Sequence, residues 1–445
     1  MHYDLIFKNG NVVSPDSTQV SDIAVSGGKI IKIEKLDSGD TADEVYDAKG
    51  KYILPGVIDA HVHFRDPGLT EKEDFETGSI AAAMGGITMA ADMPNTVPVT
   101  STLKTFNEKL KIANEKSYID FGLYALLNND NLEEMQNLKD AGAFGFKIFL
   151  GTSTGDIAAP SPSVLFRQME FCAAELGLRI AFHCETSEIN TYFTSLFKDD
   201  KNMQDGYKLT RSRPVFSEAL GVQTVVCYAQ YTGAKIHILH ITSRETAYLT
   251  AEAKKKNANI TAETCPHYLL FNCEDNAFKV YPPIRSEKCR NALWDSLKNG
   301  TIDMIASDHA PHTIKEKSLP VSETPAGLSG VETSVPLMLN EVNKGKLTLN
   351  EYVRLSSEAP AKIWGIYPQK GSLLPGTDAD FTIVDMDLKK TINANELHSK
   401  SKTNPYDGTK VQGFPIATIV RGMFVMRNGS LCGKKGSGVL VSPEL

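Results

Sequence analysis

The sequence predicts a (β/α)8 TIM barrel with a small β-sandwich domain formed by both chain termini, and three observations lead to that prediction. Residues 57–368 alternate short apolar runs with amphipathic stretches, the pattern of strands joined by helices. Eight such runs occur, the number of strands in a closed parallel barrel. Residues 1–56 and 369–445 read instead as strands separated by tight turns. A doubly wound open sheet is the alternative, but no Gly-x-Gly-x-x-Gly motif follows the first run.

The predicted barrel strands can be checked for chemistry at their carboxyl ends, where barrel active sites lie. The strands are 57–63, 87–90, 119–126, 145–150, 180–183, 235–240, 260–263 and 302–307, with helical patterns such as 79–84, 164–176 and 244–256 between them. Five of the eight carry or precede an ionisable group, namely His61 and His63, Lys147, His183, His240 and Asp308. These residues are therefore the candidate site.

The end segments lead us to predict one domain built from both termini. Asn9-Gly10 and Gly27-Gly28 predict hairpin turns, because such turns need positive φ. Short β-type apolar segments occur again at 380–384 and 417–425. Neither end has enough strands for a stable core, so we expect the two to pair. We place a composite sandwich domain at 1–56 with 369–445, and the barrel at 57–368.

Composition and charge indicate a globular protein and argue against some kinds of partner. Hydrophobic residues make up 41% and charged residues 23%, as in ordinary globular proteins. The net charge of -7 argues against nucleic acid as a partner, because phosphate binding needs a basic face. We find no signal peptide pattern and no uncharged apolar stretch of the roughly 18 residues that span a bilayer. We expect a cytoplasmic protein that acts on a small molecule, and we keep a homodimer as an open hypothesis.

The His-x-His pair at the first strand end indicates a metal site. His61 and His63 are two apart, so both imidazoles point to one side of a strand. Neutral imidazoles suit a zinc-type ion. A second metal nearby would need a bridging anion, and Lys147 would become one by reacting with carbon dioxide. Two other readings stay open: Lys147 extends its ammonium group to solvent, or Asp156 supplies the bridge.

His237 is expected to lie on the opposite strand face from His240 and to pack beneath the helices.

Longer motifs resemble the dihydroorotase family of the amidohydrolase superfamily. They are 59–70, 73–78, 85–88, 93–96, 146–151, 183–185, 240–243, 263–267, 307–312 and 375–380, and cover nearly the whole chain. The resemblance implies two Zn²⁺ ions, one held by His61, His63 and Asp308 and the other by His183 and His240. It also implies that carboxylated Lys147 bridges them, although some family members use an aspartate, which keeps Asp156 as the alternative.

The resemblance further implies an activity, the reversible hydrolysis of (S)-dihydroorotate to N-carbamoyl-L-aspartate in pyrimidine (UMP) biosynthesis. A metal-held hydroxide would attack the ring amide, and Asp308 would move the proton to the leaving nitrogen. The implied substrate contacts are Arg65, Asn95 and His312 at the carboxylate, and Ala326, Gly327 and Tyr281 at the ring. Many bacterial members carry an asparagine where Tyr281 stands. An isolated Arg65 would form a surface salt bridge with Asp66 or Glu71 instead.

Three rival functions remain. Hydantoinases and dihydropyrimidinases share the metal ligands, but lack an arginine at position 65 and have a tyrosine where this chain has Thr152. Allantoinases differ around Arg65 and Met93-Pro94-Asn95. A catalytically inactive scaffold homologue would lack some ligands, whereas the candidate set is complete here.

Overall fold

A closed parallel barrel forms the centre of the molecule. The computed structural model describes residues 1–151, 157–256 and 259–444. Eight strands follow one another in chain order around the barrel. They are β6 (Val57–Val62), β7 (Ile87–Asp92), β8 (Asp120–Leu126), β9 (Gly145–Phe149), β10 (Ile180–His183), β11 (Ile236–Ile238), β12 (Ile260–Thr264) and β13 (Met304–Ile305). The barrel closes where the His63 backbone N–H donates to the His309 carbonyl at 2.7 Å. The barrel prediction is confirmed.

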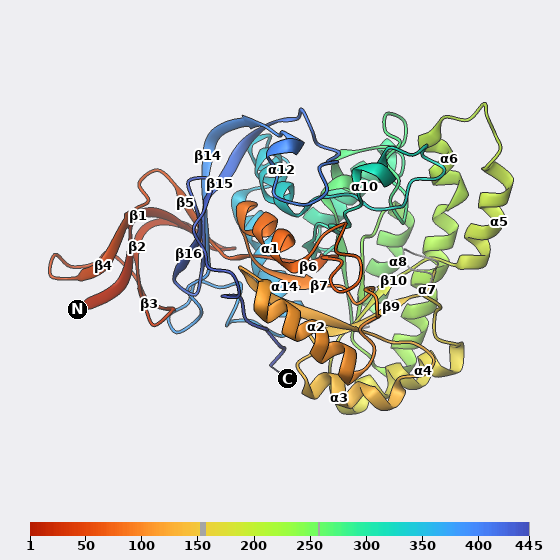
Figure 1. Ribbon diagram of the computed structural model, residues 1–445, viewed down its shortest axis with the longest axis horizontal. Helices are drawn as coiled ribbons and strands as arrows, with labels where there is room; N and C mark the ends of the chain where they lie inside the picture. The colour runs from red at the N-terminus through yellow and green to blue at the C-terminus, as the bar shows by residue number, and fades with distance from the viewer. Residues whose placement is uncertain (152–156, 257–258, 445) are drawn as a thin grey trace.

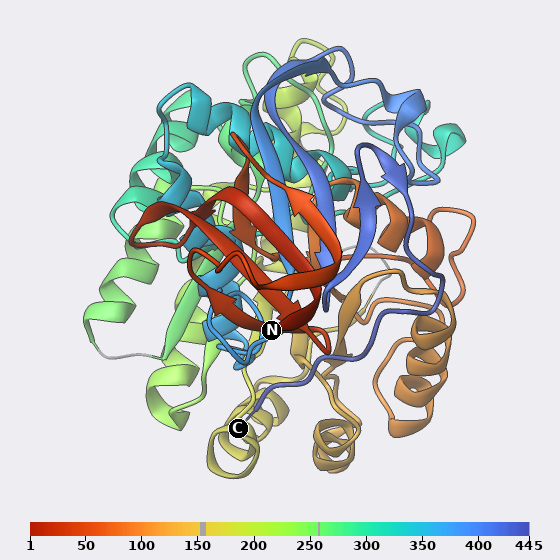
Figure 2. The same ribbon diagram turned by 90° about the vertical axis from the view of Figure 1, so that its left-hand side faces the viewer.

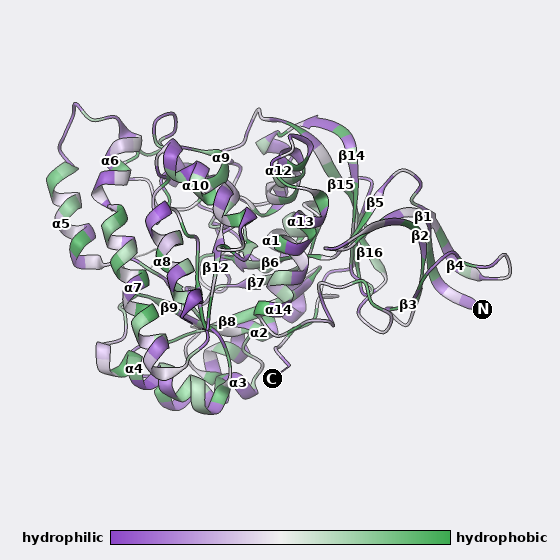
Figure 3. Cartoon of the chain, turned by 180° about the vertical axis from the view of Figure 1, so that it is seen from behind, coloured by the Kyte–Doolittle hydropathy of each residue, from purple (hydrophilic) through white to green (hydrophobic). Residues whose placement is uncertain are grey.

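Helices surround the barrel, and several continue the predicted amphipathic patterns (Figure 1). They are α1 (Phe75–Met84), α2 (Leu103–Lys116), α3 (Met135–Asp140), α4 (Pro162–Phe171), α5 (Ser187–Phe197), α6 (Asp205–Ser212), α7 (Val215–Thr232), α8 (Arg244–Lys255), α9 (Pro266–Leu270), α10 (Glu287–Lys298), α11 (Ile314–Lys317), α12 (Val331–Asn343), α13 (Leu349–Val353) and α14 (Ala359–Ile363). Figure 3 shows green and purple residues mixed along α4, α7 and α8, as expected for helices that cover a core on one side. No helix among the described residues is long and apolar enough to cross a membrane.

Aromatic side chains fill one end of the barrel interior. Trp364, which follows α14, is 2% exposed and packs on Phe144 and Tyr124 with ring centroids 5.2 and 5.1 Å apart. The Tyr124 hydroxyl donates to the Ala60 carbonyl at 2.9 Å. A packed interior of this kind leaves only the opposite end of the barrel for chemistry.

The two chain ends pair into one sheet, as predicted. Its strands are β1 (His2–Val13), β2 (Thr18–Ser26), β3 (Lys29–Ile33), β4 (Thr41–Asp47), β5 (Tyr52–Pro55), β14 (Phe381–Thr391), β15 (Lys410–Val420), β16 (Met423–Arg427) and β17 (Ser430–Leu431). β5 joins the halves by pairing with both β1 and β14. Apolar residues of six strands form its core, including Phe7, Ile53 and Phe381. Figure 2 shows the N- and C-terminal strands side by side over the barrel.

One of the two predicted hairpin turns is wrong. Gly27 and Gly28 do form the tight turn between β2 and β3, with φ of 59° and 73°. Asn9 also has positive φ, 60°, but β1 continues through it. The register with β2 shifts there, so Asn9-Gly10 forms a β-bulge. The exact domain boundaries that we place at residues 56 and 369 remain a prediction.

Candidate metal and substrate site

The candidate ligands from separate strands converge on one cavity at the barrel mouth. Its described lining residues are His61, His63, Arg65, Asn95, Lys147, Phe149, His183, His240, Val280, Tyr281, Asp308, Ala310, Ala326 and Gly327. All six proposed metal ligands are in this set, as are all the proposed substrate contacts except His312. The residues come from positions up to 266 apart in the sequence, and the barrel brings them together.

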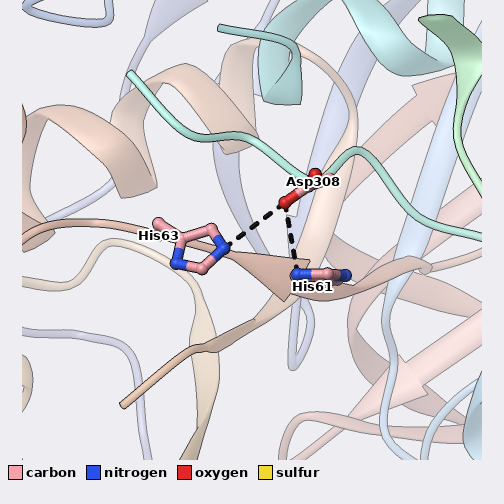
Figure 4. Close-up of side chains that lie close together, drawn as sticks. All are labelled: His61, His63 and Asp308. Carbon is pink, nitrogen blue, oxygen red and sulfur yellow. Dashed lines mark ion pairs between the residues drawn. The ribbon is translucent and has the colours of Figure 1, made fainter. Parts of the chain in front are cut away.

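Three of the candidate ligands face one another at close range (Figure 4). Asp308 Oδ1 lies 3.2 Å from His61 Nε2 and 3.3 Å from His63 Nε2. One ligand atom from each of these residues lies within 4.8 Å of the other two, so a single ion can contact all three. All three side chains are buried. Two imidazoles and a carboxylate are a suitable ligand set for zinc.

Oxygen acceptors fix which nitrogen of each imidazole is available. His61 Nδ1 lies 2.5 Å from Glu263 Oε1, and His63 Nδ1 lies 2.7 Å from Asn95 Oδ1. Because these oxygens only accept, each Nδ1 is assigned the proton, which leaves each Nε2 lone pair facing Asp308. Such outer contacts orient metal-binding histidines.

A second pair of imidazoles faces the cavity from β10 and β11. His183 Nδ1 lies 3.0 Å from His240 Nε2. His183 Nε2 lies 2.9 Å from Glu185 Oε2, which assigns it the proton and leaves Nδ1 as a lone pair. His240 Nδ1 is buried without a hydrogen-bond partner among the described residues. His183 Nδ1 and His240 Nε2 are therefore close enough to bind the same ion.

Most of the candidate imidazoles are neutral at physiological pH, which favours metal binding. Burial lowers the pKa of His63 to about 3, and it also lowers the pKa of His183 and, more strongly, of His240. Neutral imidazole is the form that binds metal. His61 differs, because its two neighbouring carboxylates outweigh burial and raise its pKa. A cation at the site would displace that proton.

Lys147 is a buried amine in β9. It is 1% exposed, so the reading in which its ammonium reaches solvent is wrong. Burial lowers its pKa to about 7, against the opposing effects of Asp308 and Glu263. A substantial fraction of the amine is therefore uncharged near neutral pH and able to react with carbon dioxide. The alternative bridge, Asp156, lies outside the described residues, as does Thr152.

Arg65 places a buried cation beside the candidate ligands. It is 2% exposed, its Nε donates to the Pro311 carbonyl at 3.3 Å, and its Nη2 lies 3.5 Å from His312 Nε2. In the described part of the chain, no ion pair joins it to a carboxylate, and Asp66 pairs with Lys116 instead. The alternative of a surface salt bridge to Asp66 or Glu71 is therefore wrong. Burial lowers the Arg65 pKa to about 10, so it stays charged at neutral pH.

The remaining substrate-contact candidates surround the same space. His312 lies next to Arg65, and its Nε2 is 2.9 Å from the Ala326 carbonyl oxygen. Gly327 has φ of 139°, and a Cβ there would lie 2.4 Å from the Ala310 carbonyl oxygen, so only glycine fits this wall. Tyr281 lines the cavity and stacks on Arg213.

The prediction that His237 packs beneath the helices is wrong. Its Nε2 lies 3.2 Å from Glu263 Oε2, inside the barrel, and its ring centroid is 5.4 Å from that of Trp364. The reason is that β11 ends at Ile238, and His240 has φ of 38°. The two-residue alternation of a strand therefore does not extend to His240.

Our sequence reasoning missed the carboxylates that hold the imidazoles. Glu263 and Glu185 are fully buried, and each contacts a candidate metal ligand. Charged residues inside apolar strand ends are unusual unless they are paired, and that signal was available in both motifs.

Comparison with known proteins identifies one family and several similar hydrolases. Residues 52–425 match the model of the Amidohydrolase family. L-hydantoinase of Paenarthrobacter aurescens is 37% identical over 99% of this chain and 98% of its own length. An allantoinase of Desulfitobacterium hafniense (strain DSM 10664 / DCB-2) and a dihydroorotase of Methanosarcina acetivorans are each 36% identical, over 97% and 98% of this chain and 97% and 94% of their own lengths. The solved structure of L-hydantoinase from Arthrobacter aurescens has a TM-score of 0.95 at 36% identity, covering 99% of this chain and 100% of that chain.

Fold and site together define a barrel hydrolase with metal-binding groups at its mouth. The chain belongs to the Amidohydrolase family. Its similar proteins carry the names of hydrolases of cyclic amides, and the chain is a cyclic amidohydrolase.

Proposed function

We propose that this chain is a dihydroorotase, which interconverts (S)-dihydroorotate and N-carbamoyl-L-aspartate. The observation that carries the proposal is Arg65, a buried guanidinium on the wall of the cavity that also holds the candidate metal ligands. A buried cation on the wall of this cavity favours a cyclic amide that carries a carboxylate. Hydantoin and dihydrouracil carry none. Dihydroorotate does.

The donor set fits two divalent ions. His61, His63 and Asp308 would hold one, and His183 and His240 the other. The neutral imidazoles, and the 3.0 Å approach of His183 Nδ1 to His240 Nε2, are the observations that favour this assignment. Lys147, as a carbamate, is our choice for the bridge, with Asp156 as the alternative. When bound, zinc lowers the pKa of a coordinated water to about 7 and polarises a substrate carbonyl.

The chain's own residues would bind the ring and move one proton. Arg65, with Asn95 and His312 nearby, would hold the carboxylate, while the backbone at Ala326 and Gly327 would contact the ring. Asp308 is a carboxylate at neutral pH, because neighbouring imidazoles outweigh burial and lower its pKa. Its Oδ1 faces two imidazoles, so we assign Oδ2 to accept the proton of the attacking water and to deliver it to the leaving nitrogen.

An Arg65→Met variant tests this proposal. We expect kcat/KM for dihydroorotate to fall about 10- to 100-fold, mainly through KM, because hydrogen bonds to charged groups contribute roughly 1.5–3 kcal/mol. Metal content should stay unchanged. Arg427→Met, at an exposed arginine that pairs with Glu44 at 2.5 Å, is the matched control. Unchanged kinetics on dihydroorotate would remove Arg65 from this role.

A hydantoinase- or allantoinase-type activity is the second candidate. The observation that favours it is Tyr281, which lines the cavity where many similar dihydroorotases have an asparagine. The L-hydantoinase likeness over almost the whole chain points the same way. Purified protein that turns over hydantoin or allantoin faster than dihydroorotate would decide for this candidate.

A further inference from the structure

Arg213 stands between a wall of the cavity and a candidate metal ligand. Its guanidinium carbon lies 3.6 Å from the centroid of the Tyr281 ring, which lines the cavity. Its Nη2 lies 2.6 Å from Glu185 Oε2, and its Nε lies 3.0 Å from Glu185 Oε1. Glu185 Oε2 in turn accepts from His183 Nε2 at 2.9 Å. One guanidinium therefore contacts an aromatic ring with its face and a carboxylate with its edge.

The backbone of Arg213, just after α6, is held in place by Arg285 from the segment before α10. Its carbonyl accepts from Arg285 Nη1 at 2.5 Å, and Arg285 Nη2 reaches Glu218 Oε2 at 3.2 Å. Glu218 also accepts the backbone N–H of Thr242, two residues after His240, at 3.0 Å. Arg213, Arg285 and Glu218 are all buried. The backbone that carries the guanidinium is therefore fixed relative to both Tyr281 and Glu185.

We propose that Arg213 is a positioning residue that couples Tyr281 to His183 through Glu185, so that the substrate wall and one metal position behave as a unit. This inference rests on the proposed metal site. A planar guanidinium is suited to the role, because its face can stack while its N–H groups form a bidentate pair, which an ammonium group cannot do. Loss of Arg213 leaves the Glu185 carboxylate with Asn190 Nδ2, at 3.2 Å from Oε1, as its other side-chain donor, so the His183 imidazole is held less firmly.

The coupling also assigns a specificity role to Tyr281. Its ring is held against the guanidinium, so it offers the substrate a rigid aromatic wall, whereas an asparagine at this position would offer amide hydrogen bonds. We therefore expect recognition on this side of the cavity to depend on packing against the ring. Tyr281→Leu should raise KM more than it lowers kcat. Arg213→Lys should lower kcat as well, because it disturbs His183.

Zinc affinity of the holoenzyme, measured by competition with a chelator, tests the proposal without reference to substrate. Arg213→Lys should weaken one of the two zinc positions about 10- to 100-fold, the usual cost of losing an outer contact. Tyr281→Leu should weaken the same position to a smaller extent, and Tyr281→Phe, which keeps the ring against the guanidinium but loses the hydroxyl contact with Arg213, should lie between Tyr281→Leu and the wild type. Arg427→Lys, at an exposed arginine, is the control for the chemical change.

Three results would overturn the proposal. The first is an Arg213→Lys protein that binds zinc as tightly as Arg427→Lys, and the second is a Tyr281→Leu protein with wild-type affinity. The third is equal loss of both zincs together with a lower urea midpoint, which marks a structural role alone. If the wild type does not turn over dihydroorotate, the proposed substrate is wrong, but the zinc comparison still decides this inference.

Discussion

Replacing Glu263 with glutamine is expected to weaken zinc binding at His61. Glu263 Oε1 lies 2.5 Å from His61 Nδ1, and Oε2 lies 3.2 Å from His237 Nε2. A carboxylate accepts from both imidazoles, but a glutamine offers one acceptor and one donor. Only one of the two imidazoles can then donate to residue 263, and the other must accept from its amide group. Where that ring is His61, the proton moves to Nε2 and removes the lone pair that a metal needs.

The expected size of this effect follows from the lost contact. Outer partners of metal-binding histidines contribute about 10- to 100-fold in affinity, or roughly 1.4–2.8 kcal/mol. Chelator competition at neutral pH measures it, with urea unfolding of the metal-free protein as a check on folding. Glu332→Gln is the matched control, because Glu332 Oε1 pairs with an imidazole outside the cavity, His398 Nδ1, at 2.9 Å. A folded Glu263→Gln protein with wild-type zinc affinity would show that Glu263 does not orient His61 towards the metal.

Three further predictions concern stability, the bridge and pH. Trp364→Ala should lower the free energy of unfolding by about 3–5 kcal/mol in urea, because a fully packed ring is removed; a change below about 1 kcal/mol would contradict the packing. Lys147→Ala should lose bound metal, measured by atomic absorption, and regain part of it with short carboxylic acids; a variant that keeps both metals would favour Asp156. Burial raises the pKa of Glu185, but Arg213 and His183 outweigh burial and lower it to about 2 from 4.5. The resulting stabilisation, about 3 kcal/mol, is present above pH 4.5 and lost as the pH falls towards 2, and Glu185→Gln should flatten that dependence in acid unfolding curves.

The barrel could be predicted because each strand carries its own local signal. The range 180–183 predicted from the sequence is the observed β10, and the predicted first strand differs from β6 by one residue. Short apolar runs bounded by turns identify buried parallel strands without knowledge of their partners. Rules on where barrels place their chemistry then located the candidate ligands.

The errors arose where the backbone leaves regular geometry. Asn9 and His240 both have positive φ, which no hydrophobic pattern reports. At Asn9 a strand continues through a bulge where we predicted a turn. At His240 the side chain no longer alternates with His237, so both point into the barrel.

Most of the supporting contacts could not be predicted because they join distant parts of the chain; the contact of Glu185 with His183, two residues away, is the exception. Glu263 is 202 residues from His61, and Arg213 is 28 residues from Glu185. Nothing local to these residues indicates which imidazole or carboxylate they reach. Only the closed barrel fixes those distances.

Anomalous X-ray scattering at the zinc edge, from crystals of the purified protein, is the sharpest test of a two-zinc site. We expect two peaks in the cavity, one among His61, His63 and Asp308 and one between His183 and His240, with extra density on the Lys147 amine. A single peak, or peaks away from these side chains, would contradict it.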